Sequence, residues 1–217
     1  MGSLDTHQEL MGRISSTLGV TVFGVDYRLA PENPWPAAVE DAVAIWRALP
    51  ALGLDPTHVV VAGDSAGGGL TMALLLELKS GGDAMPAGAV TFSPWADLTC
   101  SGGSVRSRAE ADPMIQPGSL DAMAAHYVGN ADARSPTISP LFGDLAGVPP
   151  LLIQVGGDEV LLDDAVRLHE NAKAMGTESA LHVFDGAFHV FQAMPMLPEA
   201  QDALDEMASF CEGLWWR

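Results

Sequence analysis

Ser65 lies in the sequence G-D-S-A-G at residues 63–67, between two apolar runs. Three valines at 59–61 favour a strand before the motif, and the run at 70–78 favours a helix directly after it. A strand that turns sharply into a helix lifts the serine hydroxyl clear of the sheet, where it acts as a nucleophile. The N-terminus of the helix then directs the amide of Ala66 at developing negative charge. We therefore predict that Ser65 is a nucleophile and that Ala66 contributes to an oxyanion hole.

The glycines of this motif have a second role. Gly63 and Gly67 lack a Cβ, so we expect the strand and helix backbones to approach each other closely at both positions. A glycine-rich turn of this kind also occurs as a purely packing feature or as a phosphate-binding loop. The sequence contains neither G-x-x-x-x-G-K-[ST] nor G-x-G-x-x-G, so the nucleophile interpretation is preferred.

A serine nucleophile needs a base, and histidine has the side chain whose pKa suits neutral pH. His189 ends the sequence D-G-A-F-H, just beyond the last predicted strand. The order serine, acid, histidine along the chain is typical of one large class of hydrolases, which favours His189 as the base. The other histidines fall in helices, in an irregular region, at the wrong end of the serine strand or inside a strand: His7, His58, His126, His169 and His182.

Two adjacent carboxylates follow a predicted strand at residues 151–155, and either could orient the histidine. They are Asp158 and Glu159, in the sequence G-G-D-E. Consecutive side chains point in different directions, so we expect only one of them to reach His189. Asp163 and Asp164 are less favoured candidates for the acid, because they begin the next helix and we expect them to cap it. The residues by themselves leave the choice between Asp158 and Glu159 open.

Predicted strands and helices alternate along most of the chain, which indicates an α/β fold with a mostly parallel sheet covered by helices on both faces. The strands are predicted at residues 20–25, 59–62, 87–92, 151–155 and 180–184, and helices at 4–18, 37–49, 70–78, 163–175 and 199–215. Residues 102–150 are irregular, with one helical piece near 120–128, and we expect this excursion to lie over the strand ends. The candidate residues all follow strand ends, where such sheets place their active sites.

The composition predicts one globular domain over residues 1–217, with 48% hydrophobic and 18% charged residues. A formal charge of −18 disfavours nucleic acid and anionic membranes as partners. No apolar run approaches the roughly 20 residues of a membrane span. The two cysteines have neither disulfide-framework nor metal-site spacing, so we expect a reducing, cytoplasmic compartment and no bound metal.

Five segments together resemble the hormone-sensitive-lipase family, whose bacterial members are called family IV carboxylesterases. They are D-Y-R-L-A-P-E at 26–32, G-D-S-A-G-G at 63–68, S-P-W-A-D-L at 93–98, G-D-E-V-L-L-D-D at 157–164 and F-H at 188–189. The resemblance runs from about residue 2 to the C-terminus. It implies an α/β-hydrolase-like fold and a serine esterase that acts on short- to medium-chain esters without a cofactor. The family's D-P-L-x-D segment corresponds to residues 159–163, which favours Glu159 over Asp158 as the acid.

One family feature is absent. The H-G-G-G segment, whose amides supply much of the family's oxyanion hole, normally precedes a stretch like residues 1–3, and residues 1–217 contain no replacement. We therefore expect a fold without the upstream strands and the upstream part of the cap, with open strand edges that favour a homo-oligomer. The leading prediction is a carboxylesterase with a small-molecule ester as its partner. The alternatives are a weakly active or inactive truncated member and a non-catalytic relative that binds a small molecule.

Overall fold

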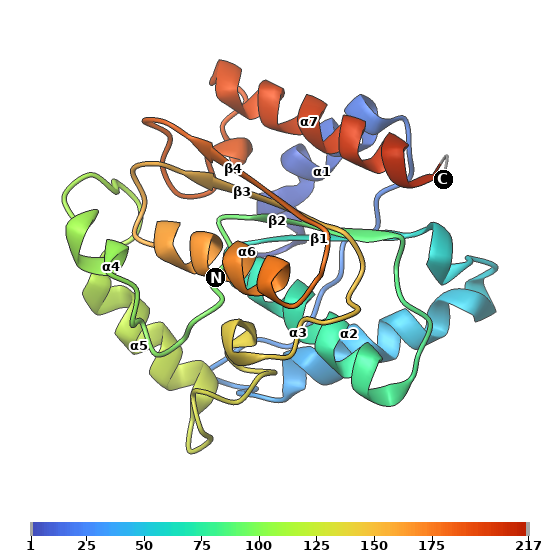
Figure 1. Cartoon of the computed structure of the whole chain (residues 1–217), viewed down its shortest axis with the longest axis horizontal. Helices are drawn as coiled ribbons and strands as arrows, with labels where there is room; N and C mark the ends of the chain where they lie inside the picture. The colour runs from blue at the N-terminus through green and yellow to red at the C-terminus, as the bar shows by residue number, and fades with distance from the viewer. Residues whose placement is uncertain (1, 216–217) are drawn as a thin grey trace.

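Within the part of the chain that the structure describes, the sheet has four parallel strands in the order in which they occur along the chain. The computed structural model describes residues 2–215 (Figure 1). The strands are β1 (Val60–Asp64), β2 (Gly88–Phe92), β3 (Leu151–Gly156) and β4 (Ser179–Phe184). In register, Asp64 lies opposite Phe92, Phe92 opposite Gln154 and Gly156 opposite Phe184. The carboxyl ends of all four strands therefore meet at one edge of the sheet, and four of the five predicted strands are confirmed.

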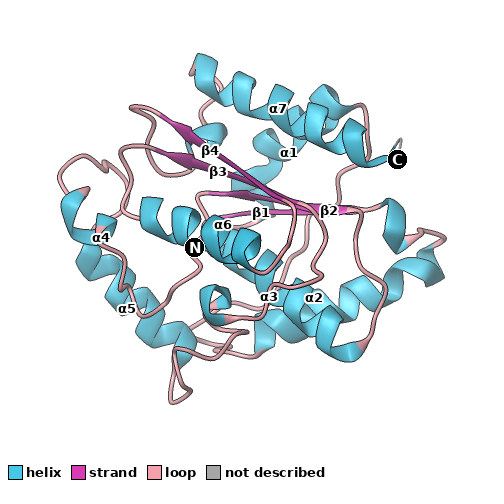
Figure 2. Ribbon diagram, viewed as in Figure 1, coloured by secondary structure: helices cyan, strands magenta, loops and turns pink. Residues whose placement is uncertain are grey.

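Helices cover both faces of the sheet (Figures 1 and 2). One face carries α1 (Leu4–Leu18) and α7 (Pro198–Trp215); the other carries α3 (Ala66–Gly81) and α6 (Leu162–Ala174), with α2 (Ala37–Ala48) packed against α3. Side chains alternate between the two layers: Ile153 packs with α3 and α6, whereas Leu152 packs with α1 and α7. This alternation is the period-2 pattern of a strand buried on both faces. The predicted α/β architecture is confirmed.

The prediction of a strand at residues 20–25 is wrong. Residues 20–29 form neither helix nor strand, and β1 is an edge strand of the described sheet. A strand requires a neighbour for its backbone hydrogen bonds, and within the described residues no strand lies beside this segment. The side chain of Phe23 is 66% exposed. Because an open strand edge favours pairing with another chain, a homo-oligomer stays a prediction.

The irregular region at 102–150 contains α4 (Ser104–Ser107), the predicted helical piece as α5 (Pro117–Val128), and a short 3₁₀ turn at Pro140–Phe142. Further 3₁₀ turns lie at Leu49–Leu52, Pro56–His58 and Phe191–Ala193. The hydroxyl of Ser104 donates to the carbonyl of Val160 (2.7 Å), and a carboxylate oxygen of buried Asp112 accepts from the amide of Val160 (3.0 Å). These bonds attach the region to the loop that follows β3. No helix among residues 2–215 has both the length and the apolar character needed to cross a membrane.

Candidate active site

Ser65 occupies the sharp turn between β1 and α3. Its backbone has φ 53° and ψ −118°, a conformation that non-glycine residues rarely adopt. The amide of Ser65 donates to the carbonyl of Phe92 (2.8 Å), and the carbonyl of Ser65 accepts from the amide of Trp95 (2.9 Å). The neighbouring strand end therefore holds the strained turn in place. The hydroxyl of Ser65 stands at the carboxyl edge of the sheet, as the strand–turn–helix pattern predicts.

The close approach around this turn needs glycine at positions that the sequence only partly indicated. A Cβ on Gly63 would collide with the carbonyl of Gly67, so the predicted approach of strand and helix is present there. The helix backbone that approaches Gly63 is that of Gly67, but Gly67 need not itself be glycine, because a Cβ at that position would meet no atom within 4 Å outside its own helix. Gly68 and Gly69 have further steric requirements, since a Cβ on Gly68 would collide with Cα of Pro94 and one on Gly69 with the carbonyl oxygen of Trp95. The motif's third consecutive glycine therefore packs the helix against the loop after β2.

His189 lies between Ser65 and Glu159. Its Nε2 is 2.9 Å from Oγ of Ser65, and its Nδ1 is 3.1 Å from Oε1 of Glu159. Glu159 is an acceptor when ionised, so Nδ1 carries a proton and Nε2 is free to accept one from the hydroxyl. The side chains of His189 and Glu159 are 4% and 0% exposed, so the contact between imidazole and carboxylate is shielded from water. The arrangement meets the hydrogen-bond distances that general-base activation of a nucleophile requires.

Asp158 points away from His189. Its side chain is 41% exposed, and its Oδ1 lies 3.4 Å from a guanidinium nitrogen of Arg108. Only its backbone approaches the histidine loop, through an amide that donates to the carbonyl of Ala187 (2.9 Å). Of the two carboxylates that the residues alone left open, Glu159 is therefore the one brought to His189.

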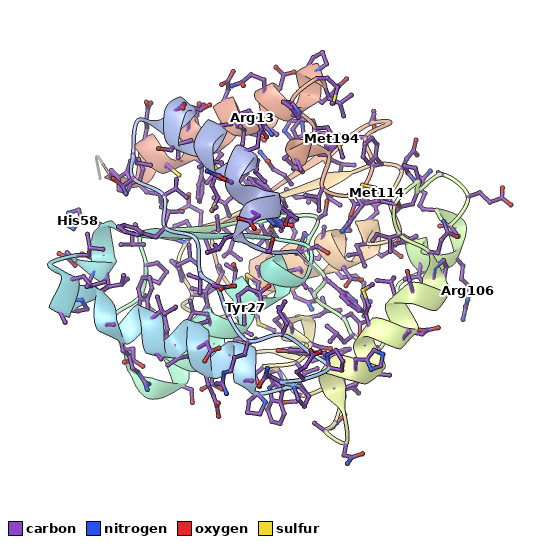
Figure 3. The ribbon with its side chains drawn as sticks, turned by 180° about the vertical axis from the view of Figure 1, so that it is seen from behind. Arg13, Tyr27, His58, Arg106, Met114 and Met194 are labelled. Carbon is purple, nitrogen blue, oxygen red and sulfur yellow. The ribbon has the colours of Figure 1, made fainter. Side chains whose placement is uncertain are left out.

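The remaining histidines lie elsewhere, with one exception that sequence reasoning missed. His58 lies at the periphery of the molecule (Figure 3), where its Nδ1 is 3.2 Å from Oδ2 of Asp55. By contrast, His7 of α1 places its Nε2 3.2 Å from Oδ2 of Asp64, the residue directly before Ser65. The periodicity of α1 predicts a helix but does not indicate which of its polar side chains reaches a strand end.

Ser93 also contacts the candidate site, although nothing in the sequence beyond its place in S-P-W-A-D-L marks it as a site residue. Its hydroxyl donates to Oε2 of Glu159 (2.7 Å), which also accepts from the amide of Gly156 (2.8 Å). Its position was the one available indication that Ser93 belongs to the site. Phe92 ends β2, so Ser93 comes directly after a predicted strand, at the carboxyl edge of the sheet. Glu159 is thus held by groups from two strand ends.

The prediction that Asp163 and Asp164 cap their own helix is wrong. The residue before α6 is Leu161, and it makes no side-chain capping bond. Oδ2 of Asp164 instead accepts from the amides of Ala96 (2.9 Å) and Asp97 (2.8 Å), and Asp163 accepts from the amide of Ser104 (3.0 Å). Both carboxylates therefore join the helix to loops that are distant in sequence.

Burial raises the pKa of the Asp164 carboxyl to about 7, from an ordinary value of 3.8. The amides of Asp97 and Ala96 and the charge of Arg167 oppose this shift, while the charge of Asp97 adds to it. In the unfolded chain the carboxyl loses its proton near its ordinary pKa, whereas the folded chain keeps it up to about pH 7. The contribution of protonated Asp164 to the free energy of unfolding is therefore complete below about pH 4. It falls as the pH rises to 7, by roughly 4 kcal/mol in all.

We expect Asp164→Asn to gain stability relative to the unchanged chain as the pH rises. The amide has no proton to lose, and its oxygen still accepts from Ala96 and Asp97. The Tm difference, variant minus unchanged chain, should increase between about pH 4 and 7 and level off above 7. Scanning calorimetry at closely spaced pH values measures it. A Tm difference that is constant across this range would contradict a titrating Asp164.

The amide of Ala66 is free to bind an anion. It donates no hydrogen bond to any acceptor within residues 2–215, and it begins α3, where a helix dipole favours negative charge. Among the same residues, no group of three or more His, Cys, Asp and Glu side chains is arranged to hold a metal ion. The groups gathered at this edge are therefore a hydroxyl, an imidazole, a carboxylate and a backbone amide.

Comparison with known proteins places these features in a family. A profile described as α/β hydrolase fold matches residues 1–193. The chain is 43% identical over 211 residues to an acetyl-hydrolase from Streptomyces hygroscopicus, covering 97% of this chain and 71% of that protein. It is 38% identical to an esterase from Acinetobacter venetianus, covering 99% and 71%.

Solved structures agree with the sequence comparison. An esterase/lipase from an uncultured bacterium superposes with a TM-score of 0.96 at 49% identity, covering all of this chain and 73% of that one. An esterase of the bacterial hormone-sensitive lipase family superposes with a TM-score of 0.97 at 44% identity, covering 99% and 73%. The chain therefore belongs to the hormone-sensitive-lipase family of esterases with the α/β-hydrolase fold.

Proposed function

We propose that this chain is a serine carboxylesterase that hydrolyses short- to medium-chain carboxylic esters through an acyl-enzyme. The observation that carries the proposal is the continuous relay from Oγ of Ser65 through His189 to Glu159, with contacts of 2.9 and 3.1 Å. Acyl transfer needs a nucleophile, a base within hydrogen-bond reach and a group that holds the base in the correct tautomer. These three side chains meet that requirement.

In the first half of the reaction, Oγ of Ser65 attacks the ester carbonyl carbon while Nε2 of His189 takes the hydroxyl proton. The amide of Ala66 donates to the oxyanion that forms, and Glu159 offsets the charge of the imidazolium. When the tetrahedral intermediate collapses, the ester C–O bond breaks and His189 protonates the departing alcohol. In the second half, water attacks the acyl-enzyme with His189 again as the base, which releases the carboxylic acid and restores Ser65.

Two observations bear on the ester. The Streptomyces relative is named an acetyl-hydrolase, which favours a small acyl group for this chain as well. The formal charge of −18 disfavours the approach of anionic substrates, so an uncharged ester fits better. The reaction as written uses only groups of the protein and water.

A fluorophosphonate probe tests the proposal against a non-catalytic relative that binds a small molecule. The probe reacts only with an activated hydroxyl, so we expect mass spectrometry to find one phosphonyl group on Ser65. His189→Ala should slow labelling strongly, because the base is gone, whereas His58→Ala serves as a matched control at a distant histidine. A chain whose Ser65 stays unmodified under conditions that label other serine hydrolases would overturn the proposal.

Supplying more oxyanion donors should raise the rate. Ala66 is the only oxyanion donor identified among residues 2–215, and the sequence contains no H-G-G-G. Each additional fixed donor is worth roughly 10² to 10³ in kcat, because a preorganised amide does not have to reorient as charge develops. We expect that joining an H-G-G-G-bearing segment upstream of residue 2 raises kcat/KM for an aryl acetate at least about a hundredfold. A matched segment with H-A-A-A is the control. Equal rates for the two would mean that other groups bind the oxyanion.

A further inference from the structure

We propose that Ser93 is a positioning residue that holds both Glu159 and the loop carrying His189 through a single hydroxyl group. The inference rests on the proposed function, in which Glu159 orients His189. Ser93 follows β2 directly and is fully buried. Its amide donates to the carbonyl of Gln154 (2.7 Å), which extends the ladder between β2 and β3 and fixes the residue at the edge of the sheet.

The hydroxyl of Ser93 makes two bonds that differ in direction. Oγ donates to Oε2 of Glu159 (2.7 Å) and accepts from the amide of Val190 (3.0 Å). An ionised carboxylate only accepts hydrogen bonds and a backbone amide only donates them. The single hydroxyl proton of Ser93 therefore points to Glu159, and a lone pair of the hydroxyl oxygen accepts from the amide of Val190. One side chain therefore links the acid to the residue that follows the base.

The contact with Val190 acts on a strained part of the chain. Val190 has φ 51°, in the left-handed region that β-branched residues avoid, and Ser93 itself has φ 49°. Strained conformations of this kind persist only where surrounding contacts hold them. Here the loop is held on both sides of His189: the carbonyl of Ala187 accepts from the amide of Asp158 (2.9 Å), and Ser93 accepts from Val190.

The contact with Glu159 decides which carboxylate oxygen faces the imidazole. Oε2 accepts from Ser93 and from the amide of Gly156, and Oε1 is left for Nδ1 of His189. Loss of the hydroxyl would leave Oε2 with one donor and would leave the amide of Val190 without an acceptor in a buried site. Both changes disturb the contact between acid and base without touching the ester, so the effect should appear in kcat rather than in KM.

Ser93→Ala and Ser93→Gly together test this role. We expect each to lower kcat for an aryl acetate about 10- to 100-fold, the range for one hydrogen bond to a charged group, with KM changed less than about twofold. Glycine accommodates a positive φ without strain, so Ser93→Gly retains the fold even if alanine does not. Ser139→Ala is the matched control, because Ser139 is also fully buried and its hydroxyl accepts only from the amide of Leu98 (2.8 Å). It should lower Tm and leave kcat within about twofold.

A double-mutant cycle separates positioning from general packing. If Ser93 acts in part through Glu159, then Ser93→Gly should cost clearly less in kcat when Glu159→Gln is already present than in the unchanged chain, because only the contact with Val190 is then left to lose. Losses that multiply in the double variant, or Ser93 variants that match the Ser139→Ala control, would overturn the inference while the proposed function stands. A starting chain that neither hydrolyses esters nor reacts with the phosphonate would instead overturn the proposed function, and the role of Ser93 with it.

Discussion

Ser65→Ala is expected to abolish ester hydrolysis, with a loss on the order of 10⁶ in kcat for a short-chain aryl ester. The hydroxyl of Ser65 is the group that His189 Nε2 contacts at 2.9 Å, so alanine removes the atom that would carry the acyl group. His189→Ala should cost about as much, because a serine without its base is a weak nucleophile at neutral pH. Steady-state rates measured above the spontaneous hydrolysis of the ester check both.

The effects of Ser65→Ala and His189→Ala on kcat should not be additive. Because nucleophile and base act as one unit, the double variant Ser65→Ala, His189→Ala is expected to retain the same residual rate as either single variant. Ser16→Ala is a suitable control, since Ser16 is exposed on α1 and its hydroxyl bonds only the carbonyl of Gly12 (2.8 Å). If Ser65→Ala turned over the ester at the unchanged rate, the serine mechanism would be wrong.

The second large effect distinguishes the two neighbouring carboxylates. Glu159→Gln should lower kcat on the order of 10⁴, because the amide no longer fixes the tautomer of His189 or offsets its positive charge. Gln is close to isosteric with Glu, so the buried site keeps its packing and the loss reports the charge. Asp158→Asn should cost about tenfold or less, since its side chain lies beside Arg108 rather than His189.

Measuring kcat and KM for both variants on one ester, together with Tm, decides the assignment. Comparable Tm values would show that neither variant acts through unfolding. The reverse ranking, with Asp158→Asn the more damaging, would transfer the role of the acid to Asp158. A small effect of Glu159→Gln with no loss from Asp158→Asn would mean that His189 works without an orienting acid.

Patterns that depend on neighbours in the sequence were predicted well. The valine run before G-D-S-A-G and the apolar run after it predicted β1 and α3, because strand and helix periodicities are local properties of the chain. The strand predicted at residues 20–25 shows where this reasoning fails. Its residues have a strand-like composition, but a strand also requires a partner, and the described sheet offers none beside it.

The candidate site also has features that local sequence predicts and others that depend on the tertiary structure. Ser65 and His189 were predicted from local context and chain order, and the family resemblance favoured Glu159 where the residues alone did not. The contacts themselves join side chains that are 30 and 124 residues apart, so only the packing of strand ends at one edge brings them together.

The sequence by itself determined the strand–turn–helix at Ser65, the alternating elements and the small set of candidate acids and bases. Only the tertiary structure decided that Glu159 rather than Asp158 faces the imidazole, that Asp164 holds the loop after β2, and that Ser93 joins acid to base. The reason is physical. Secondary structure follows from the order of neighbouring residues, whereas a hydrogen bond depends on the direction of two side chains whose backbones are placed by different strands.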